Sequence, residues 1–340
     1  MSLGLTARSA FRSGDERFAQ LLAFGAAGLL LLFLAWPLSE ILWKAFRTPE
    51  GAWAGFRALG SILAEPRLQD AAWNSVWIAG ITVLLVVPTA LLFAFALTHS
   101  RVPGKPLLKT LALSPLLAPS LMPAISLVYL FGNQGLLKGW LQGASVYGPI
   151  GIVLGEVFYT FPHALLVLVT ALGITDARLY EAAEVLGASR FRRFLSVTVP
   201  HIRYGLIAAC LIVFTLAVTD FGVPKVVGGQ TNVLALEAYK QVIGQQNFQK
   251  GAAVGLLLLL PALLSFGVER WLARGHSGSI SGRSVAYSAK PSLVRDGLFW
   301  LFCAAVCLFL LAMIGTAMAA SFMKLWPYNL SPTLAHYDFD

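Results

Sequence analysis

The chain has 340 residues, of which 57% are hydrophobic and only 12% are charged. A water-soluble core of this length cannot hide so much apolar side chain, so the composition argues against a soluble protein and predicts a membrane protein. The formal net charge is +9, but the basic residues are scattered over short segments without interleaved aromatic residues, which argues against binding of nucleic acid.

Seven apolar runs long enough to cross a hydrocarbon layer of roughly 30 Å follow one another along the chain. The runs are continuous and do not alternate with polar residues, which excludes a membrane β-barrel. The sequence therefore predicts an all-α polytopic membrane protein, a helical bundle with a six-helix core and one further helix. The expected spans are 18–46, 72–98, 107–131, 149–172, 202–221, 252–273 and 298–322.

The first run follows Arg8, Arg12 and Arg17, as in a signal peptide, but it is too long for a signal sequence and no small-residue cleavage site follows it. We therefore expect an uncleaved helix behind a cytoplasmic tail at 1–17. With the N-terminus in the cytoplasm, most Lys and Arg residues fall in cytoplasmic segments, in agreement with the positive-inside rule.

Between the spans, 47–71 and 223–251 are long enough to fold as small caps outside the membrane. The segment 275–296, rich in Ser, Gly and basic residues, is expected to be a cytoplasmic linker. The three cysteines all lie in apolar runs, where they have no further ligands for a zinc site and are expected to be packing residues.

Motifs for common catalytic and nucleotide-binding sites are missing. There is no phosphate-binding G-x-x-x-x-G-K-[ST], no H-E-x-x-H pair and no Gly-x-Ser-x-Gly elbow. The sequence thus predicts neither an enzyme nor a cofactor.

The stretch "TDARLYEAAEVLGASRFRRFLSVTVP", residues 175–200, carries charge between two apolar runs. Thr175 or Asp176 is a plausible cap of a first helix that stops at Gly187. Ser189 is a plausible cap of a second helix, which Pro200 is expected to end. This pattern predicts a helical hairpin, shaped either to bind a partner or to lie on anionic lipid headgroups.

The order "EAA", three residues, Gly187, nine residues and "VTVP" resembles the cytoplasmic loop of ABC importer permeases. The resemblance extends over essentially the whole chain and favours binding of a partner over lipid contact. It implies a bacterial inner-membrane protein whose partners are a cytoplasmic ABC ATPase dimer, an extracytoplasmic solute-binding protein and a small solute. It further implies an ATPase-docking loop made of Glu181, Ala182, Ala183, Gly187, Arg190, Arg192, Arg193 and Pro200.

Within that family, "FGNQGLLKGWL" and "TDFGVPKVVGGQTNVLALEAYKQVIGQQNFQ" look most like the 2-aminoethylphosphonate permeases, which are similar to the fused ferric-iron permeases. The spans show no obvious cluster of Cys, Tyr and carboxylate residues for a hard trivalent cation, which favours the phosphonate. Ferric iron remains the alternative solute, and a membrane-embedded enzyme using Glu156 and His163 is the alternative from another class.

Polar groups at membrane depth are candidates for a substrate pathway because they are costly there. Three lie on one face of the fourth span, and prolines at every fourth position are expected to bend the third span. Pairing of Glu156 and His163 with a neighbouring helix is an equal alternative, and Asp220 could instead meet a binding protein. The candidates are Glu156, Tyr159, His163, Pro119, Pro123 and Asp220.

The seventh run and the residues after it resemble the first run in layout, which predicts that 297–340 begin a second permease repeat. In that case 18–274 form one permease domain, and the native reading frame is expected to continue into a second half. The alternative is that Asp340 is the true end and that a second copy or a separate subunit completes the pathway.

Overall fold

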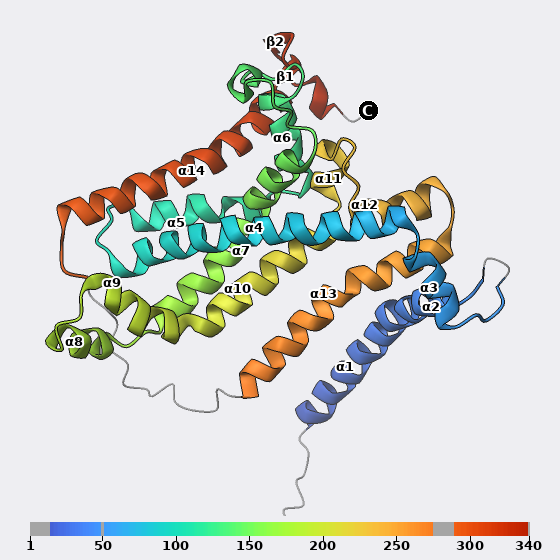
Figure 1. Ribbon diagram of the computed structural model, residues 1–340, viewed down its shortest axis with the longest axis horizontal. Coiled ribbons are helices and arrows are strands. Elements are labelled where there is room, and N and C mark those ends of the chain that lie inside the picture. Colours follow the sequence, from blue (N-terminus) through green and yellow to red (C-terminus); the bar gives the residue numbers. More distant parts are fainter. Residues whose placement is uncertain (1–13, 49–50, 275–288, 339–340) are drawn as a thin grey trace, which may run out of the picture.

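The computed structural model describes residues 14–48, 51–274 and 289–338. Within these ranges the chain is almost entirely helical, with one small antiparallel hairpin near its carboxyl end (Figure 1). Residues 1–13 of the expected tail and 275–288 of the expected linker lie outside the described residues.

Six helices in the described ranges are long and apolar enough to cross a membrane, and a bent pair counts as a seventh. The predicted all-α polytopic fold is therefore confirmed. The first crossing consists of α1 and α2, joined by a π-helical turn. The long helices are α1 (Gly14–Leu30), α2 (Trp36–Ala45), α4 (Pro66–His99), α7 (Pro149–Gly173), α10 (Val199–Thr219), α13 (Phe248–Arg274) and α14 (Leu293–Ser321).

The expected third span is broken into α5 (Lys105–Leu113), a short 3₁₀ turn (Ser114–Leu117) and α6 (Leu121–Phe131), which are bent by 102°. Ala118 is extended, with a ψ of 137°, because the ring of Pro119 disfavours a helical conformation in the preceding residue. The predicted bend is confirmed, but it is sharp enough to give two separate helices in place of one kinked span.

Short helices form the expected caps at the end of the bundle opposite α8 and α9 (Figure 1). They are α3 (Phe56–Leu63), α11 (Gly222–Val227) and α12 (Leu234–Tyr239). A β carbon at Gly155 of α7 would lie 2.5 Å from Cγ1 of Val223, so α11 reaches α7 only because this residue is glycine. Gly151 and Gly155, four residues apart on α7, thus serve close packing of α11 against α7.

The core lies where α4, α7 and α10 pack together, and α14 packs against α4, α5 and α6. Phe93 and Phe161 are fully buried in an edge-to-face contact of 5.8 Å between their ring centres. Cys303 and Cys307 are buried on α14, which confirms their predicted packing role.

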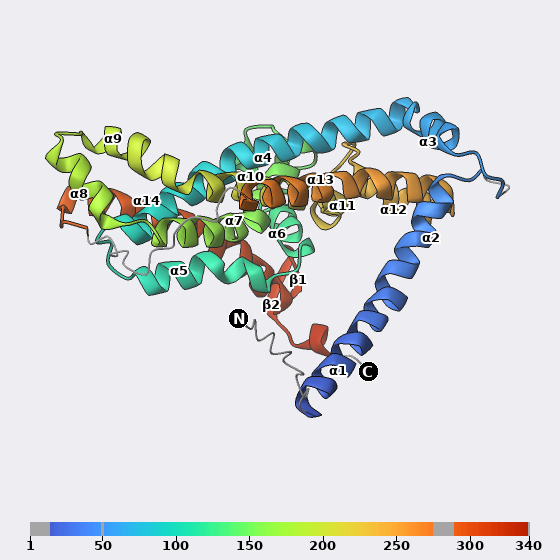
Figure 2. The ribbon, with the colours of Figure 1, turned by 90° about the horizontal axis from the view of Figure 1, so that it is seen from below.

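The first and seventh spans differ in their packing although their layouts are similar. None of the apolar window in Phe18–Ala45 is buried, and α1 with α2 extends from the bundle as an arm (Figure 2). Both spans lead into a small antiparallel turn: an isolated bridge between Arg47 and Trp53 after α2, and strands β1 (Met323–Leu325) and β2 (Asn329–Pro332) after α14. A single 3₁₀ turn, Ala335–Tyr337, follows β2.

Pro200 does not end a helix, which corrects the sequence prediction. One helical segment runs from Arg190 to Thr219, with a π-helical turn at Phe194–Thr198 just ahead of the proline. A π turn widens the helix locally, so the proline ring is accommodated without breaking the helix. The same arrangement recurs at Leu31–Ala35, ahead of Pro37.

Candidate functional site

The predicted helical hairpin consists of α8 (Ala177–Val185) and α9 (Arg190–Arg193). Asp176 caps α8 by accepting a hydrogen bond of 3.1 Å from the backbone N–H of Arg178, and Ser189 caps α9 by accepting one of 3.3 Å from Arg192. Gly187 joins the two helices with a φ of +73°, a conformation that favours glycine. The sequence-predicted caps and turn are therefore confirmed.

A buried hydrogen bond fastens the hairpin to the start of α10. The hydroxyl groups of Tyr180 and Thr198 are 2.8 Å apart, and both residues are buried. The ring of Tyr180 also contacts His99, whose ring stacks on Phe95 at 4.7 Å with an interplanar angle of 8°. The hairpin is thus in direct contact with the last turn of α4.

Glu184 links the two helices of the hairpin to the segment that precedes α14. It accepts a hydrogen bond of 2.8 Å from Lys290 and one of 3.0 Å from Arg193. These cationic donors, Lys290 foremost, lower the pKa of Glu184. Sequence reasoning missed this residue because Lys290 is far away along the chain, and only the Glu184 and Arg193 spacing within one hairpin hinted at an ion pair.

The segment before α14 is held by a second set of contacts. Nε of Arg101 donates to the carbonyl oxygen of Ala289 at 2.8 Å, and a carboxylate oxygen of Asp296 accepts from the backbone N–H of Arg101 at 3.2 Å. The loop after α4, the hairpin and the start of α14 therefore meet at one end of the molecule, as three segments on one side of a membrane must.

The free surface of the hairpin combines one acidic group with apolar side chains. Glu181 is exposed, and Val185 and Leu186 are 88% and 86% exposed beside the turn. Ala182 is exposed and Ala183 is partly exposed, so both small residues are accessible to another chain. Exposed apolar side chains around a fixed turn are typical of a protein-binding surface.

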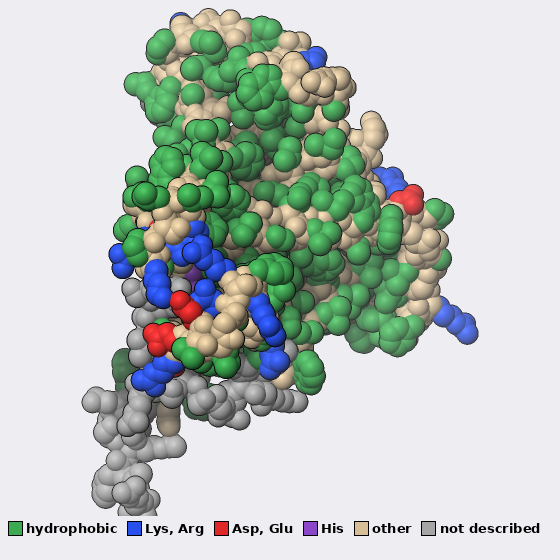
Figure 3. All heavy atoms as spheres, turned by 60° about the vertical axis from the view of Figure 1, so that its left-hand side comes forward, with side chains coloured by type: hydrophobic (Ala, Val, Ile, Leu, Met, Phe, Trp, Pro, Cys, Tyr) green, Lys and Arg blue, Asp and Glu red, His purple; other side chains and the backbone are tan. Residues whose placement is uncertain are grey.

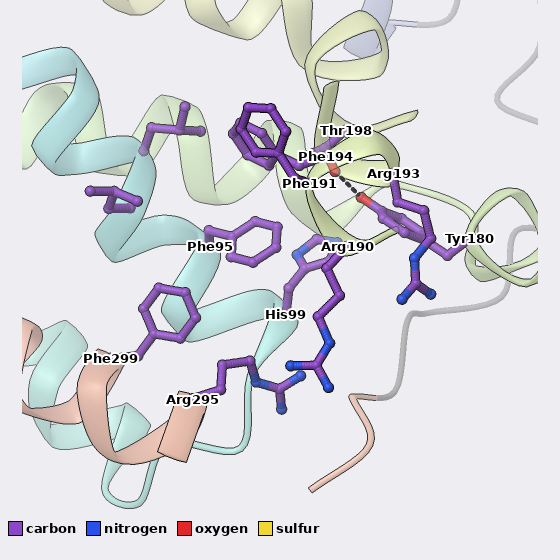
Figure 4. A pocket seen from close by; sticks show the side chains of 12 residues that line it. Phe95, His99, Tyr180, Arg190, Phe191, Arg193, Phe194, Thr198, Arg295 and Phe299 are labelled. Atoms are coloured by element: carbon purple, nitrogen blue, oxygen red, sulfur yellow. Dashed lines mark hydrogen bonds between the residues drawn. The ribbon is translucent and has the colours of Figure 1, made fainter. Parts of the chain in front are cut away.

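The three predicted docking arginines do not share one environment. Arg190 and Arg193 line a cavity of about 480 Å³ beneath the hairpin, together with Arg295 of α14 (Figure 4). Arg192 does not line it, and Pro200 is exposed on α10. In Figure 3, Lys and Arg side chains gather at this end of the molecule beside an extensive apolar surface.

The structure brings together two of the predicted pathway residues, Glu156 and Asp220. Glu156 is fully buried and its carboxyl group interacts with that of Asp220, which is 8% exposed. The two carboxyl groups lie within electrostatic range of each other, but both carboxyl oxygens of Glu156 are buried without a hydrogen-bond partner among the described residues. Asp220 also accepts a hydrogen bond of 2.7 Å from the backbone N–H of Val223.

Tyr159 lies within electrostatic reach of both carboxyl groups, and His163 contacts Tyr159. The ring centres of Tyr159 and His163 are 5.7 Å apart, and Nδ1 of His163 lies 3.2 Å from the carbonyl oxygen of Tyr159. Tyr159 therefore lies between His163 and the carboxyl pair along the predicted face. The structure thus places Tyr159 near two carboxyl groups, but it does not test whether these three groups could hold a trivalent cation.

The break in the third span lies near Asp220, because Ser120 at this break packs against the start of α11. A β carbon at Gly222 would approach Oγ of Ser120, so the start of α11 packs into the break that Pro119 creates. Pro119 is exposed at the break and Pro123 is buried in α6. Among the described residues, no group of three or more His, Cys, Asp or Glu side chains is arranged to hold a metal ion.

A further buried carboxylate, Glu237 of α12, lies at the end of the bundle opposite the hairpin and was missed in the sequence. Asn232 and Gln241 each donate a hydrogen bond of 2.6 Å to it, and Nε of Arg67 lies 3.3 Å away. Burial alone raises the pKa of Glu237, but these donors outweigh it and the pKa is lowered. The network holds α12 to the start of α4.

Residues 58–277 match the family described as "Binding-protein-dependent transport system inner membrane component". The match covers more than half of the chain and includes the α8–α9 hairpin, the broken third span and the carboxyl pair. The chain belongs to this family and is a multi-pass inner-membrane component of the ABC importer type.

Two relatives illustrate the range of the family. The putative ferric transport system permease protein FbpB 1 of Haemophilus influenzae is 25% identical over 329 residues, which are 91% of this chain and 50% of that protein. The sulfate transport system permease protein CysW of Escherichia coli K12 is 30% identical over 211 residues, 60% of this chain and 72% of that one. The chain thus spans about half the length of the ferric relative.

A solved structure shares the fold. The crystal structure of a bacterial alginate ABC transporter in complex with an alginate pentasaccharide-bound periplasmic protein matches with a TM-score of 0.62 at 17% identity. The match covers 80% of this chain and 97% of the chain in that structure. At this identity the likeness concerns the arrangement of helices.

Proposed function

We propose that this chain forms one half of the transmembrane pathway of an ATP-driven importer, and that a separate ABC ATPase dimer docks on the α8–α9 hairpin from the cytoplasm. The observation that carries this proposal is the hairpin itself. It exposes Glu181, Val185 and Leu186 to a partner while Tyr180 binds Thr198 in the interior. A partner bound to the exposed side of the hairpin can therefore displace it, and the buried hydrogen bond transmits this displacement to α10.

The contacts under the hairpin give a physical route for coupling. A displacement of α8 acts on α10 through the hydrogen bond between Tyr180 and Thr198, and on α4 through the rings of His99 and Phe95. Because α4, α7 and α10 pack as one core, tilting α4 and α10 shifts the helix that carries Glu156. The hairpin therefore couples to the candidate pathway without chemistry of its own.

We infer that ferric iron is a better candidate solute than 2-aminoethylphosphonate. The alignment with the ferric permease extends over 91% of this chain, and two carboxyl groups with a nearby phenol offer the hard oxygen ligands that suit Fe³⁺. A phosphonate anion would be repelled by the same carboxyl groups when they are ionised. The relatives described above give the phosphonate no support.

We also propose that a second permease half, in the same chain or in another, completes the pathway, and that an extracytoplasmic binding protein delivers the solute. The arm of α1 and α2 supports a second half, because none of its apolar window is buried whereas α14 packs against the core. In this arrangement the chain spans the inner membrane with its N-terminus in the cytoplasm.

Uptake measurements test the solute and the coupling together. Cells lacking the permease are complemented with the gene for this chain and its neighbours, and uptake of radiolabelled iron and radiolabelled 2-aminoethylphosphonate is compared. We expect iron uptake that falls in a Glu156→Gln variant. Uptake of the phosphonate without uptake of iron would contradict the proposal that ferric iron is the solute. Full uptake by a Glu181→Lys variant would contradict the proposal that the ATPase docks on the hairpin.

A further inference from the structure

Three helix ends meet around the cavity beneath the hairpin, and each repeats the same pair of residues. A polar or cationic residue lies at the mouth, and an aromatic ring lies four residues along the helix toward the membrane interior. The pairs are His99 with Phe95 on α4, Arg190 with Phe194 on the segment leading into α10, and Arg295 with Phe299 on α14.

The lining changes from charged to apolar with depth. Four residues of helix correspond to about 6 Å, so the phenylalanines lie roughly one turn below the mouth and Leu91 about two turns below it. Phe95 contacts Phe194 at 5.7 Å and Phe299 at 5.9 Å between ring centres. Leu92 lines the same cavity and is 45% exposed, so the apolar part is continuous with the surface of the spanning helices.

The mouth of the cavity carries an excess of positive charge. Arg193 pairs with Glu184, and Arg295 pairs with Asp296 at 2.7 Å. Arg190 has no ion-pair partner among the described residues, and its guanidinium group lies toward the same mouth as that of Arg295 (Figure 4). Two like charges converging on one opening repel each other, and an anion between them would stabilise both.

We propose that this cavity binds one anionic phospholipid from the membrane leaflet on the side of the hairpin. The phosphate group lies between Arg190 and Arg295, and an acyl chain lies along Leu91, Leu92 and Phe299. The gradient from cationic mouth to apolar wall matches a phospholipid, and a volume of about 480 Å³ falls in the range of roughly 300–1,000 Å³ of small-molecule sites.

This site lies apart from the solute pathway and from the exposed Glu181, Val185 and Leu186 proposed to contact the ATPase, although Arg190 belongs to the same hairpin. A lipid in it would contact α4, the start of α10 and α14 at once. Since Phe95 is part of the contact between the hairpin and α4, lipid occupancy is expected to hold these three helix ends together.

Lipid retention by the purified full chain tests the proposal. The protein is reconstituted in nanodiscs of equal phosphatidylglycerol and phosphatidylcholine, extracted in detergent, washed, and analysed by mass spectrometry for retained lipid. We expect wild type to retain phosphatidylglycerol preferentially. An Arg190→Gln, Arg295→Gln double variant is expected to lose this preference by about tenfold or more. Leu91→Trp, which narrows the apolar part, is also expected to reduce retention.

Arg192→Gln is the matched control, because it removes the same charge from the hairpin but lies outside the cavity lining. Arg190→Gln alone guards against loss of folding, because it breaks no described ion pair. The proposed lipid site would be contradicted if Arg192→Gln lost as much lipid as the variants of the cavity arginines. It would also be contradicted if wild type retained lipid without preferring phosphatidylglycerol. A separate assay measures binding of the ATPase to the same variants. If Arg190→Gln retains the lipid but no longer binds the ATPase, the cavity would be assigned to a protein partner instead. The lipid measurement itself contains no ATPase, so its result is independent of the docking proposal.

Discussion

The two ends of the bundle handle polar groups in opposite ways. At the end with α11 and α12, the carboxylate of Glu237 is 2% exposed and receives hydrogen bonds from two side chains of its own chain, with Arg67 beside it. At the end with the hairpin, Glu181 is exposed and two apolar side chains beside Gly187 lie in the open.

This difference separates a structural cap from a binding surface. Removing the partners of a buried, fully paired carboxylate strongly destabilises the folded protein, but such a carboxylate has no free hydrogen-bonding capacity for another molecule. An exposed carboxylate beside uncovered apolar groups contributes little to the stability of its own chain and gains its partners only in a complex. The four predictions below contrast the two ends.

The largest expected contrast is in access to reagents. A Cys at position 103, in the loop after α4, is expected to be protected from an impermeant thiol reagent in intact cells, whereas a Cys at position 230, beside α11, is expected to react. Both positions are exposed, so only the membrane distinguishes them. The native cysteines lie within spanning helices, and permeabilised cells are the control. The reverse labelling pattern would invert the orientation.

Next in size are variants of the hairpin. Gly187→Val places a β-branched residue at a φ of +73°, and Glu181→Lys reverses a surface charge. We expect either change to reduce uptake by about tenfold or more while membrane insertion stays unchanged; Glu181→Lys, which strains no backbone, is also expected to keep the thermal midpoint.

The controls for the hairpin variants use Gly173, which has no positive φ and open space around it, and Glu65 at the opposite end. Gly173→Val and Glu65→Lys are expected to transport like wild type. Equal losses in both pairs would show that the hairpin has no special role.

A smaller effect is expected on stability at the opposite end. Glu237→Gln removes the negative charge that accepts these hydrogen bonds, and it leaves the new amide N–H group facing a side-chain donor. This change is expected to lower the free energy of unfolding by about 2 kcal/mol. Glu65→Gln breaks an ion pair that is only partly covered, with 41% of the Glu65 side chain exposed, and is expected to cost less than about 1 kcal/mol. Denaturation of purified protein in detergent compares the two, and equal losses would contradict the structural role of Glu237.

The smallest expected effect is on the stability of α12 at acidic pH. Because the folded-state pKa of Glu237 is lowered, its contribution to stability is present above the unfolded pKa of about 4.3 and is lost as pH falls through the folded-state pKa. Hydrogen exchange in α12 is therefore expected to rise as pH falls below about 4.3, after correction for the intrinsic pH dependence of exchange. Glu237→Gln removes this dependence, and an unchanged profile in that variant would assign it to another group.

The sequence by itself determined the elements that rest on local chemistry. Continuous apolar runs define the spans, and Asp176, Gly187 and Ser189 define the hairpin, because capping and a positive φ depend on neighbouring residues. The proline pattern also predicted the bend in the third span, although not its angle of 102°.

Tertiary structure decided what distant segments do to one another. It placed Asp220 against Glu156, Lys290 against Glu184, and three helix ends around one cavity. It also let the helix pass through Pro200, and it packed the seventh span against the core while leaving the similar first span as an arm. Such outcomes depend on which surfaces meet in space, and a pattern along one segment carries no information about the partner that another segment presents to it.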